Sequence, residues 1–267
     1  MDRIERNRQI AEENEELIKK GTYEAKGRTF SLSPLPRLQE ARCFSPEELD
    51  RLAGKIEQTR SRRPGRITLV EGDTMDHAGE GVLNFANAFT PGGGYLYGAS
   101  SQEESLCRES TLYASLTGPM AAPFYEENNR EKSIYGSEAM VLSPQVEIFR
   151  QSAGKDYALF GPPKVTSVIT AAAVDLRGPA AQEPPALIHG IMERRILRLL
   201  ALFAASGCHT ITLGAWGCGV FRHDPRHVAH AFYEALVEKD YRRFFHTITF
   251  AIYGSRENLE AFRRQFR

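Results

Sequence analysis

Short apolar segments alternate with longer segments of helical periodicity from Ile67 to the C-terminus, and this alternation constrains the fold more than any other feature. The predicted strands are residues 67–70, 82–85, 139–143, 165–171, 210–213 and 247–253. The predicted helices are residues 102–116, 187–206, 225–238 and 256–266. Such an alternation predicts an α/β fold, in which helices cover both faces of a mixed or mostly parallel sheet.

The first 64 residues follow a different pattern. Their predicted elements are a charged helix at residues 3–20, a strand pair or extended arm at residues 23–32, and a helix that begins at Ser45-Pro46. At 267 residues and 42% hydrophobic content, the chain can bury one full core and still carry an extension. We therefore predict a mostly helical N-terminal extension at residues 1–64 and one α/β domain at residues 65–267.

A basic segment, Arg60-Ser-Arg-Arg-Pro-Gly-Arg66, joins these two parts. Contact with nucleic acid and a solvated connection both fit its composition, and a short run of charges is more typical of a connection. The whole chain has no net charge, with 34 basic and 34 acidic residues. Because phosphate contacts dominate the binding of proteins that track along a polyanion, neutrality favours gripping a chain end in a pocket.

A run of three glycines, Gly92-Gly93-Gly94, lies between the predicted strand at residues 82–85 and the helix that begins at Gln102. Glycines have no side chains to pack and lose backbone entropy when ordered, so the run indicates a backbone that a ligand approaches closely. The first turn of the helix holds Glu103 and Glu104. Helix capping alone explains acidic residues there, but capping does not require three glycines.

A second glycine-rich segment, residues 214–219, follows the predicted strand at residues 210–213. Successive backbone N–H groups in such a turn form a concave site for an anion, although a tight strand-to-helix turn also fits the sequence. Ligands of parallel α/β sheets bind beyond the carboxyl ends of the strands. Both glycine segments follow strands, so we expect them to line one crevice.

These two segments resemble known motifs. Gly92-Gly93-Gly94, a spacer of seven residues and then Gln102-Glu103-Glu104 resemble the signature of poly(ADP-ribose) glycohydrolases, most closely of the microbial type. Residues 213–221 are similar to the phosphate-binding loop of that branch, and the resemblance runs from about Ile67 to the C-terminus. Within the wider macrodomain fold, residues 84–87 resemble an Asn-Ala-Ala-Asn element, and Asp73 lies in a Gly-Asp element. The resemblance implies a three-layer α/β/α macrodomain-like sandwich with a mixed central sheet.

The resemblance also implies an activity, namely hydrolysis of ribose–ribose O-glycosidic bonds from chain ends with release of ADP-ribose. Residues 65–267 are then the catalytic domain, in which Glu104 is the acid and base and Glu103 accepts hydrogen bonds from ribose hydroxyls. Asp73 pairs with the adenine amino group, Asn87 holds the distal ribose, and glycine N–H groups bind the diphosphate. The substrate-binding residues that it implies are Asp73, Asn87, Gly92, Gly93, Gly94, Gln102, Gly217, Cys218, Gly219, Val220 and Phe221.

The position of the two glutamates favours a mechanism with one carboxylate. Most glycosidases use two carboxylates at least about 5 Å apart on opposite sides of the bond. Glu103 and Glu104 are neighbours on a helix and point about 100° apart, so both cannot serve as that pair. One residue that first protonates the leaving oxygen and then activates water fits this spacing better.

The chain departs from the family pattern after the predicted strand at residues 165–171. A segment with Pro and Asn is expected there, but residues 171–177 read Ala-Ala-Ala-Val-Asp-Leu-Arg. We expect Asp175 to take the place of that Asn. The departure leaves the catalytic helix unchanged and affects only the substrate contacts from this segment.

Neither a metal nor a cofactor is predicted. His223, Asp224 and His227 do not have the spacing of a His-Glu-x-x-His site, and Pro225 starts a helix between them. The four cysteines form no Cys-x-x-Cys pair, which argues against zinc and against a disulfide framework; they are Cys43, Cys107, Cys208 and Cys218.

The predicted partners are poly(ADP-ribose) or an ADP-ribosylated macromolecule, with ADP-ribose as product. No signal peptide is visible, and the apolar residues 199–205 are too few to span a membrane, so a cytoplasmic location is expected. Two alternatives remain open: removal of single ADP-ribose groups from protein or nucleic acid, and a non-catalytic ADP-ribose reader. The intact Gln102-Glu103-Glu104 argues against a reader, which needs no acid. An unrelated nucleotide hydrolase is disfavoured because the chain has no Walker-type phosphate loop.

Overall fold

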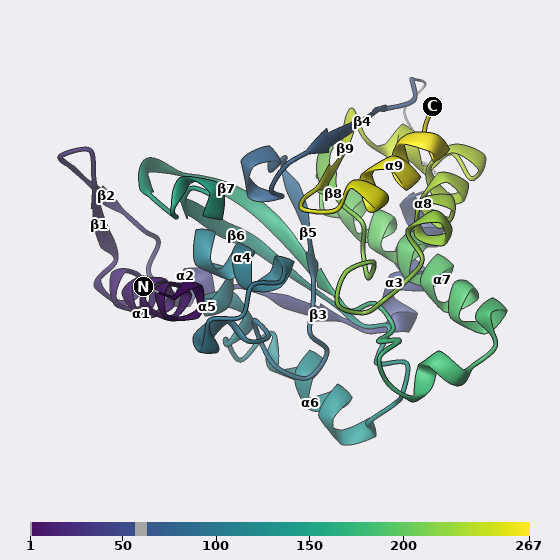
Figure 1. Cartoon of the computed structure of the whole chain (residues 1–267), viewed down its shortest axis with the longest axis horizontal. Helices are drawn as coiled ribbons and strands as arrows, with labels where there is room; N and C mark the ends of the chain where they lie inside the picture. Colours follow the sequence, from purple (N-terminus) through teal and green to yellow (C-terminus); the bar gives the residue numbers. More distant parts are fainter. Residues whose placement is uncertain (1, 57–62) are drawn as a thin grey trace.

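The computed structural model describes residues 2–56 and 63–267 (Figure 1). Within these residues, a seven-stranded sheet has the order β3-β6-β7-β5-β8-β9-β4. Its strands are β3 (Arg42–Phe44), β4 (Arg66–Glu71), β5 (Gly81–Phe85), β6 (Met140–Arg150), β7 (Leu159–Ala171), β8 (Thr210–Leu213) and β9 (Thr247–Ile252). Pairing is antiparallel from β3 to β7 and parallel from β7 to β4, which confirms the predicted mixed sheet.

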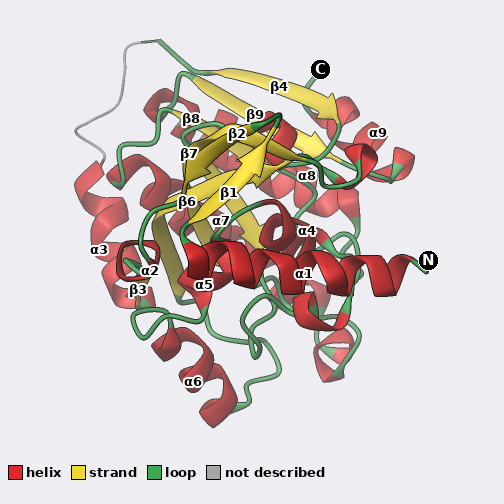
Figure 2. Ribbon diagram, turned by 90° about the vertical axis from the view of Figure 1, so that its left-hand side faces the viewer, coloured by secondary structure: helices red, strands yellow, loops and turns green. Residues whose placement is uncertain are grey.

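Helices cover both faces of this sheet (Figures 1 and 2). One layer contains α3 (Pro46–Ile56), α7 (Pro185–Ala205), α8 (Pro225–Tyr233) and α9 (Arg256–Gln265). The other contains α1 (Arg3–Lys20), α2 (Leu35–Leu38), α4 (Gln102–Glu109) and α5 (Leu112–Leu116), and α6 (Ala122–Glu131) lies at one end. Together they form the three-layer α/β/α sandwich expected from the sequence.

The core is divided between the two faces of the central strands. Val82 of β5 and Val168 of β7 pack into the cluster that contains α4 and α5, whereas the next residues, Leu83 and Ile169, pack under α7 and α8. Successive side chains of a strand point to opposite faces, and here both faces are covered by helices. This explains why apolar residues occupy consecutive positions in both strands, Val82-Leu83 in β5 and Val168-Ile169 in β7.

Several predicted elements have different bounds in the structure. The helix predicted at residues 102–116 is interrupted at Ser110, which pairs with Ile148 of β6, and the Ser110 hydroxyl donates to the carbonyl of Leu106 over 2.7 Å. Serine side chains compete with helical backbone hydrogen bonds in this way. Strands β6 and β7 are longer than predicted, because the prolines inside them made the pattern look interrupted. The helix predicted at residues 225–238 becomes a π-helical turn from Glu234.

The described residues of the N-terminal segment, 2–56, 63 and 64, make close contacts with the rest of the chain. Besides α1, α2 and α3 they contain a hairpin, β1 (Thr22–Ala25) and β2 (Arg28–Ser31), and the edge strand β3 of the main sheet. The side chain of Asn7 on α1 donates to the carbonyl of Gly98 over 3.0 Å, and that of Asn14 donates to the carbonyl of Arg108 over 2.8 Å. The division at residue 64 stays a prediction about folding units.

Local start and stop signals in this segment are confirmed. Gly21 ends α1 in the left-handed conformation, with φ of 73°. Ser45 caps α3, because its hydroxyl accepts from the N–H of Glu48 over 3.3 Å while the Glu48 carboxylate accepts from the N–H of Ser45 over 3.0 Å. Of the basic segment 60–66, residues 60–62 lie outside the described residues.

Candidate active site

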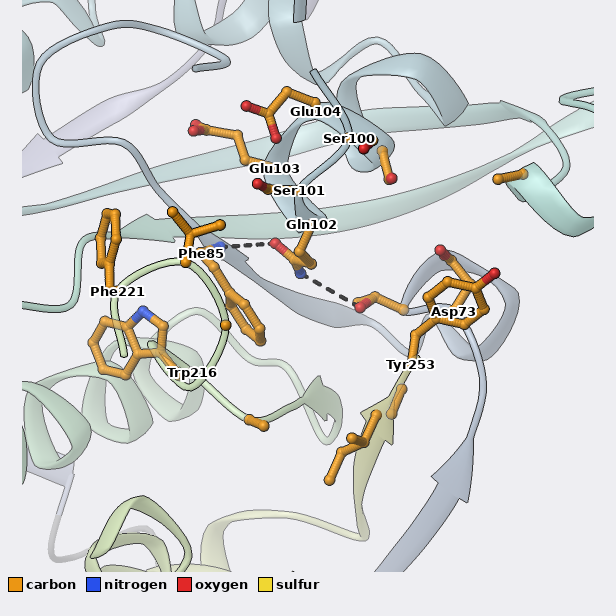
Figure 3. Close-up of a pocket in the computed structure, with 18 of the residues that line it drawn as sticks. Asp73, Phe85, Ser100, Ser101, Gln102, Glu103, Glu104, Trp216, Phe221 and Tyr253 are labelled. Atoms are coloured by element: carbon orange, nitrogen blue, oxygen red, sulfur yellow. Dashed lines mark hydrogen bonds between the residues drawn. The ribbon is translucent and has the colours of Figure 1, made fainter. Parts of the chain in front are cut away.

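A cavity of about 890 Å³ opens at the carboxyl ends of the parallel strands (Figure 3). Asp73 follows β4, Phe85 ends β5, the segment after β8 contributes Trp216, and Tyr253 follows β9. The first turn of α4 forms a further wall, so the cavity lies where the sequence placed it. The predicted site residues that line it are Asp73, Asn87, Gln102, Glu103, Glu104, Gly217, Gly219, Val220 and Phe221.

Figure 3 shows how these groups are distributed around the cavity. Glu103 and Glu104 project from α4 on one side, and Asp73 and Tyr253 lie together at another. The lining therefore has a carboxylate end and a second polar end, joined by apolar walls.

Gln102 fastens the start of α4 to the neighbouring strand. Its side-chain oxygen accepts from the N–H of Phe85 over 2.9 Å, and its side-chain nitrogen donates to the carbonyl of Leu83 over 2.8 Å. The same nitrogen lies 3.4 Å from the hydroxyl oxygen of Thr74 (Figure 3). Both ends of the amide thus have partners within the protein, and this side chain positions the helix whose next two residues are the glutamates.

Glu103 is 3% exposed, and its carboxylate accepts hydrogen bonds from several donors. One carboxylate oxygen accepts from the side chain of Asn84 over 3.1 Å, and the other accepts from the N–H of Asn87 over 2.7 Å. Burial raises the pKa of Glu103 to about 8, the charge of Glu104 raises it further, and these hydrogen bonds oppose the increase. The site therefore favours a proton on this carboxyl group in the absence of substrate.

Glu104 is bound at one oxygen only. Its Oε1 accepts from the N–H of Gly94 over 2.9 Å, which fixes the side chain. Its Oε2 is buried and has no hydrogen-bond partner among the described residues. A buried polar oxygen without a partner is unusual and indicates a group kept for a ligand or for chemistry. This oxygen is available to exchange a proton with a molecule in the cavity.

The backbone of the first glycine loop (residues 92–94) lies against these carboxylates. Gly92 and Gly93 have φ of 67° and 57°, a region that L-residues with side chains rarely adopt. The N–H of Gly93 donates to the carbonyl of Thr90 over 3.0 Å, and that of Gly94 binds Glu104. A β-carbon on Gly93 would lie 2.6 Å from Oε1 of Glu104, so a side chain at this position would displace the Glu104 carboxylate.

This arrangement corrects the predicted role of that loop. Gly92, Gly93 and Gly94 do not line the cavity, and the N–H groups of the last two are already used within the protein. The expected contact of this loop with a diphosphate therefore lacks free donors from Gly93 and Gly94. The close approach that the sequence indicated exists, but the group that approaches is a glutamate side chain rather than a ligand.

The second glycine loop (residues 214–221) has the opposite character. Gly217 has φ of 79° and its carbonyl accepts from the N–H of His223 over 3.0 Å, which closes the turn. Within the described ranges, the N–H groups of Gly217, Gly219, Val220 and Phe221 donate to no acceptor of the protein. All four residues line the cavity, and a β-carbon on Gly219 would meet no atom within 4 Å. Cys218 does not line the cavity, and its N–H donates to the carbonyl of Ala215 over 3.1 Å.

Asp73 and Asn87 have one group each left for a ligand. One oxygen of Asp73 accepts from the N–H of Met75 over 2.9 Å. The side-chain oxygen of Asn87 accepts from the N–H groups of Phe89 and Thr90 over 2.8 and 3.0 Å, so its NH₂ group stays available. Both side chains line the cavity, and their contacts with substrate stay a prediction.

The departure from the family pattern supplies a cation instead of an amide. The carboxylate of Asp175 accepts from Nε of Arg177 over 2.9 Å and from the backbone N–H of Arg177 over 3.0 Å, and Asp175 does not line the cavity. Arg177 does line it, and its guanidinium carbon lies 5.3 Å from the ring centre of Phe221. The sequence reading missed Arg177, although the Asp-x-Arg spacing was a usable signal.

The three residues weighed as metal ligands have structural roles. The Nε2 atom of His223 lies 2.8 Å from the carbonyl oxygen of Val174, and Asp224 caps α8 by accepting from the N–H of Arg226 over 2.8 Å. In the part of the chain that the structure describes, no group of three His, Cys, Asp or Glu side chains is arranged to hold a metal. No helix in that part is long and apolar enough to span a membrane.

Known structures match this architecture over nearly the whole chain. A poly(ADP-ribose) glycohydrolase from Thermomonospora curvata is 32% identical with a TM-score of 0.91, over 97% of this chain and 99% of that chain. A complex of that protein with the inhibitor ADP-HPD is 30% identical with a TM-score of 0.85, over 97% and 99%. A poly(ADP-ribose) glycohydrolase from Deinococcus radiodurans in complex with ADP-ribose is 34% identical with a TM-score of 0.80, over 88% and 98%.

The family model described as "Microbial-type PARG, catalytic domain" matches residues 11–151. A search of curated proteins finds no match. The fold and the structural matches define a glycosidase with a macrodomain-like α/β architecture. More narrowly, this chain belongs to the microbial-type poly(ADP-ribose) glycohydrolase family, whose substrate is a polymer of ADP-ribose.

Proposed function

We propose that this protein removes ADP-ribose units from the free ends of poly(ADP-ribose), with Glu104 as both acid and base. The observation that carries the proposal is the geometry of Glu104. One of its oxygens is fixed by the N–H of Gly94 over 2.9 Å, and the other is buried and unpartnered within the described residues. A carboxyl group held in this way at a cavity wall is prepared for proton transfer.

The cavity accommodates the three parts of an ADP-ribose unit. The free N–H groups of the second glycine loop, with Arg177 beside them, suit the diphosphate. Glu103 and the NH₂ group of Asn87 suit the hydroxyls of the distal ribose, next to Glu104. Asp73, at the other end, suits the adenine amino group. The Deinococcus radiodurans relative was solved with ADP-ribose and the Thermomonospora curvata relative with ADP-HPD, which supports a unit of this size.

The reaction then balances with one residue and one water molecule. Glu104 donates its proton to the leaving ribose oxygen as the bond from that oxygen to the anomeric carbon breaks, through an oxocarbenium-like transition state. Glu104, now a carboxylate, accepts a proton from water while the water oxygen bonds to the anomeric carbon. ADP-ribose and a chain shorter by one unit leave, and Glu104 is protonated again.

Release from chain ends is favoured by the form and charge of the molecule. The candidate residues surround one cavity, and the sequence has no excess of basic residues with which to track along a polyanion. An enzyme of this type binds a terminal unit and releases single ADP-ribose molecules from the start of the reaction. Cleavage within the chain would first produce intermediate oligomers.

The test compares the wild type, Glu104→Gln and the control Glu131→Gln with poly(ADP-ribosyl)ated protein. Glu131 ends α6, is exposed and does not line the cavity, so its substitution removes a carboxylate outside the candidate site. We expect free ADP-ribose from the wild type and the control, with no early oligomers, and a loss of about 10³-fold or more in Glu104→Gln. ADP-ribose binding measured by calorimetry should persist in that variant.

Each other outcome rejects a part of the proposal. Full turnover by Glu104→Gln rejects the catalytic assignment. Early oligomers reject cleavage from chain ends. Release only from mono-ADP-ribosylated protein moves the substrate to single ADP-ribose groups, and binding without any release leaves a reader.

A further inference from the structure

Trp216 is the single tryptophan of the chain, and its ring belongs to the hydrophobic core under α7 and α8. The side chain is 0% exposed, and the residue also lines the cavity. Its indole nitrogen has no hydrogen-bond partner among the described residues. A buried indole N–H usually has a partner, because leaving it unpaired costs free energy. Core packing therefore accounts for the ring of Trp216 but not for its unpaired donor.

The edge of the ring that carries this nitrogen faces the second glycine loop. In Figure 3 the nitrogen lies on the edge turned toward Phe221, and the backbone of the loop curves past this edge. Trp216 and Phe221 belong to that loop, and both line the cavity. The unpaired indole N–H is therefore grouped with the free backbone N–H groups of residues 217 and 219–221.

The second loop presents hydrogen-bond donors, whereas several of its acceptors are occupied. The carbonyl of Gly214 accepts from the backbone N–H of Trp216 over 2.9 Å, and the carbonyl of Phe221 accepts from the N–H of Leu176 over 3.2 Å. The indole N–H adds a donor to the four backbone N–H groups that have no acceptor within the described residues. An anionic oxygen fits such a site better than a hydroxyl, because a hydroxyl also has a proton to donate.

The charges beside the loop also favour an anion. Residues 175–177, which are bound to the end of the loop, and residues 222–226, which follow it, carry three arginines and two carboxylates. Both carboxylates are paired, Asp175 with Arg177 over 2.5 Å and Asp224 with Arg226 over 2.6 Å. These two segments therefore hold more positive than negative charge, which attracts a phosphate group.

We propose that the indole N–H of Trp216 donates a hydrogen bond to an oxygen of the substrate's diphosphate, beside the backbone N–H groups of the second loop. The inference rests on the proposed function, because it takes this loop as the place of the diphosphate. The ring is fixed by the core, so its donor is already oriented when the ligand arrives. Binding then supplies the acceptor that the buried N–H lacks in the free protein.

The first experiment observes the donor itself. Because the chain has one tryptophan, a ¹⁵N–¹H spectrum of the labelled protein contains one indole N–H signal. ADP-ribose and inorganic pyrophosphate should each move this proton signal downfield, as a hydrogen bond to an anionic oxygen does, and adenosine should leave it in place. The backbone N–H signals of Gly217, Gly219, Val220 and Phe221 in the same spectrum report whether the ligand is bound at the loop.

The second experiment removes only the donor. Biosynthetic replacement of tryptophan by benzothienylalanine puts a sulfur atom in place of the N–H and keeps the shape of the ring. The affinity for ADP-ribose, measured by calorimetry, should fall by about tenfold or more, because a hydrogen bond to a charged group is lost. Replacement by 5-fluorotryptophan keeps the N–H and should keep the affinity. Trp216→Phe also lacks the donor and serves if the benzothienylalanine protein does not fold, as judged by circular dichroism.

The backbone signals separate this inference from the proposed function on which it depends. If pyrophosphate and ADP-ribose move the backbone signals of the loop but not the indole signal, the diphosphate binds there without Trp216, and only this inference is overturned. If ADP-ribose binds but moves neither set of signals, the proposed diphosphate site is itself wrong. An indole signal that responds to ADP-ribose alone, while the backbone signals respond to both ligands, assigns the N–H to another part of the substrate. An equal loss of affinity for adenosine and ADP-ribose without the donor assigns Trp216 to folding alone, which also overturns the inference.

Discussion

The first glycine loop (residues 92–94) and the second (residues 214–221) lie at the same end of one sheet and use their backbones in opposite ways. In the first, the N–H of Gly94 is bound by Glu104 and the N–H of Gly93 by a backbone carbonyl. In the second, four consecutive or nearly consecutive N–H groups have no acceptor within the described residues and line the cavity.

The difference shows that the two loops of this site are rich in glycine for two separate reasons. The first loop is glycine-rich because side chains of the protein come close to its backbone, and a β-carbon on Gly93 would lie 2.6 Å from Glu104. The second is open on its cavity side, where a β-carbon on Gly219 would meet nothing within 4 Å. We therefore expect the first loop to act on catalysis and the second on binding.

Replacement of one glycine by alanine in each loop should give the largest difference in turnover between the two loops. Gly93→Ala forces a β-carbon against Glu104 at a φ of 57°, so turnover should fall by about 10²-fold or more. Gly219→Ala places its methyl group in open space, so turnover should stay within about threefold of the wild type. Steady-state kinetics on poly(ADP-ribosyl)ated protein measure both.

The affinity for ADP-ribose distinguishes displacement of Glu104 from loss of a diphosphate contact at the first loop. If Gly93→Ala weakens binding as much as it reduces kcat, the first loop holds the ligand and the comparison fails. A kcat effect that exceeds the binding effect agrees with displacement of Glu104. Circular dichroism must show that Gly93→Ala is folded, because its left-handed φ also destabilises the chain.

Substitution of Arg177 should have a smaller effect, and it tests the binding of ADP-ribose rather than turnover. Arg177→Met removes the cation next to Phe221, so ADP-ribose affinity should fall by about three- to tenfold, and the loss should shrink at high salt. Arg177→Lys keeps the charge and should retain most of the affinity. Asp175→Asn removes the carboxylate that partly neutralises Arg177 and should leave affinity equal or slightly higher. Calorimetry at two salt concentrations measures all three, and a loss in Arg177→Met that is independent of salt would contradict the assignment.

Sequence patterns located the site but not the use of every group in it. The strand at residues 82–85 and the helix start at Gln102 were recognisable, because apolar runs and capping signals are local. The acceptor of the hydrogen bond from the Gly94 N–H was not recognisable. A backbone without side chains is needed both where a glutamate ten residues away binds it and where a phosphate binds it. A run of glycines indicates that some group lies close to the backbone, but only the folded structure identifies that group.

Long-range pairings limited the prediction in the same way. The sequence analysis described residues 3–20 only as a charged helix, but Asn7 and Asn14 of this helix bind backbone carbonyls 91 and 94 residues further along the chain. Asp175 was expected to replace an Asn that contacts substrate, but its neighbour Arg177 takes its carboxylate. Ser110 interrupts a helix that periodicity alone extended, because its backbone pairs with β6. In each case a polar group of the side chain or backbone had several suitable partners, and the folded structure selected one.

The smallest expected effect concerns stability and again separates the two loops. Burial raises the pKa of Glu103 from its usual 4.5 to about 8, so the folded chain holds a proton that the unfolded chain releases between these values. The contribution of this proton to stability is complete below about pH 4.5 and is lost as the pH rises toward 8. The slope is up to about 1.4 kcal/mol per pH unit for one proton.

Glu103→Gln lacks this proton equilibrium, so its free energy of unfolding should fall less steeply between pH 5 and 8 than that of the wild type. Gly219→Ala leaves the carboxylate cluster intact and should follow the wild-type slope. Urea unfolding at pH 5, 6, 7 and 8 measures the three slopes. Identical slopes for Glu103→Gln and the wild type would mean that the N–H donors of Asn87 and Gly92 keep Glu103 ionised. The first loop would then be an anion site for the protein's own carboxylate.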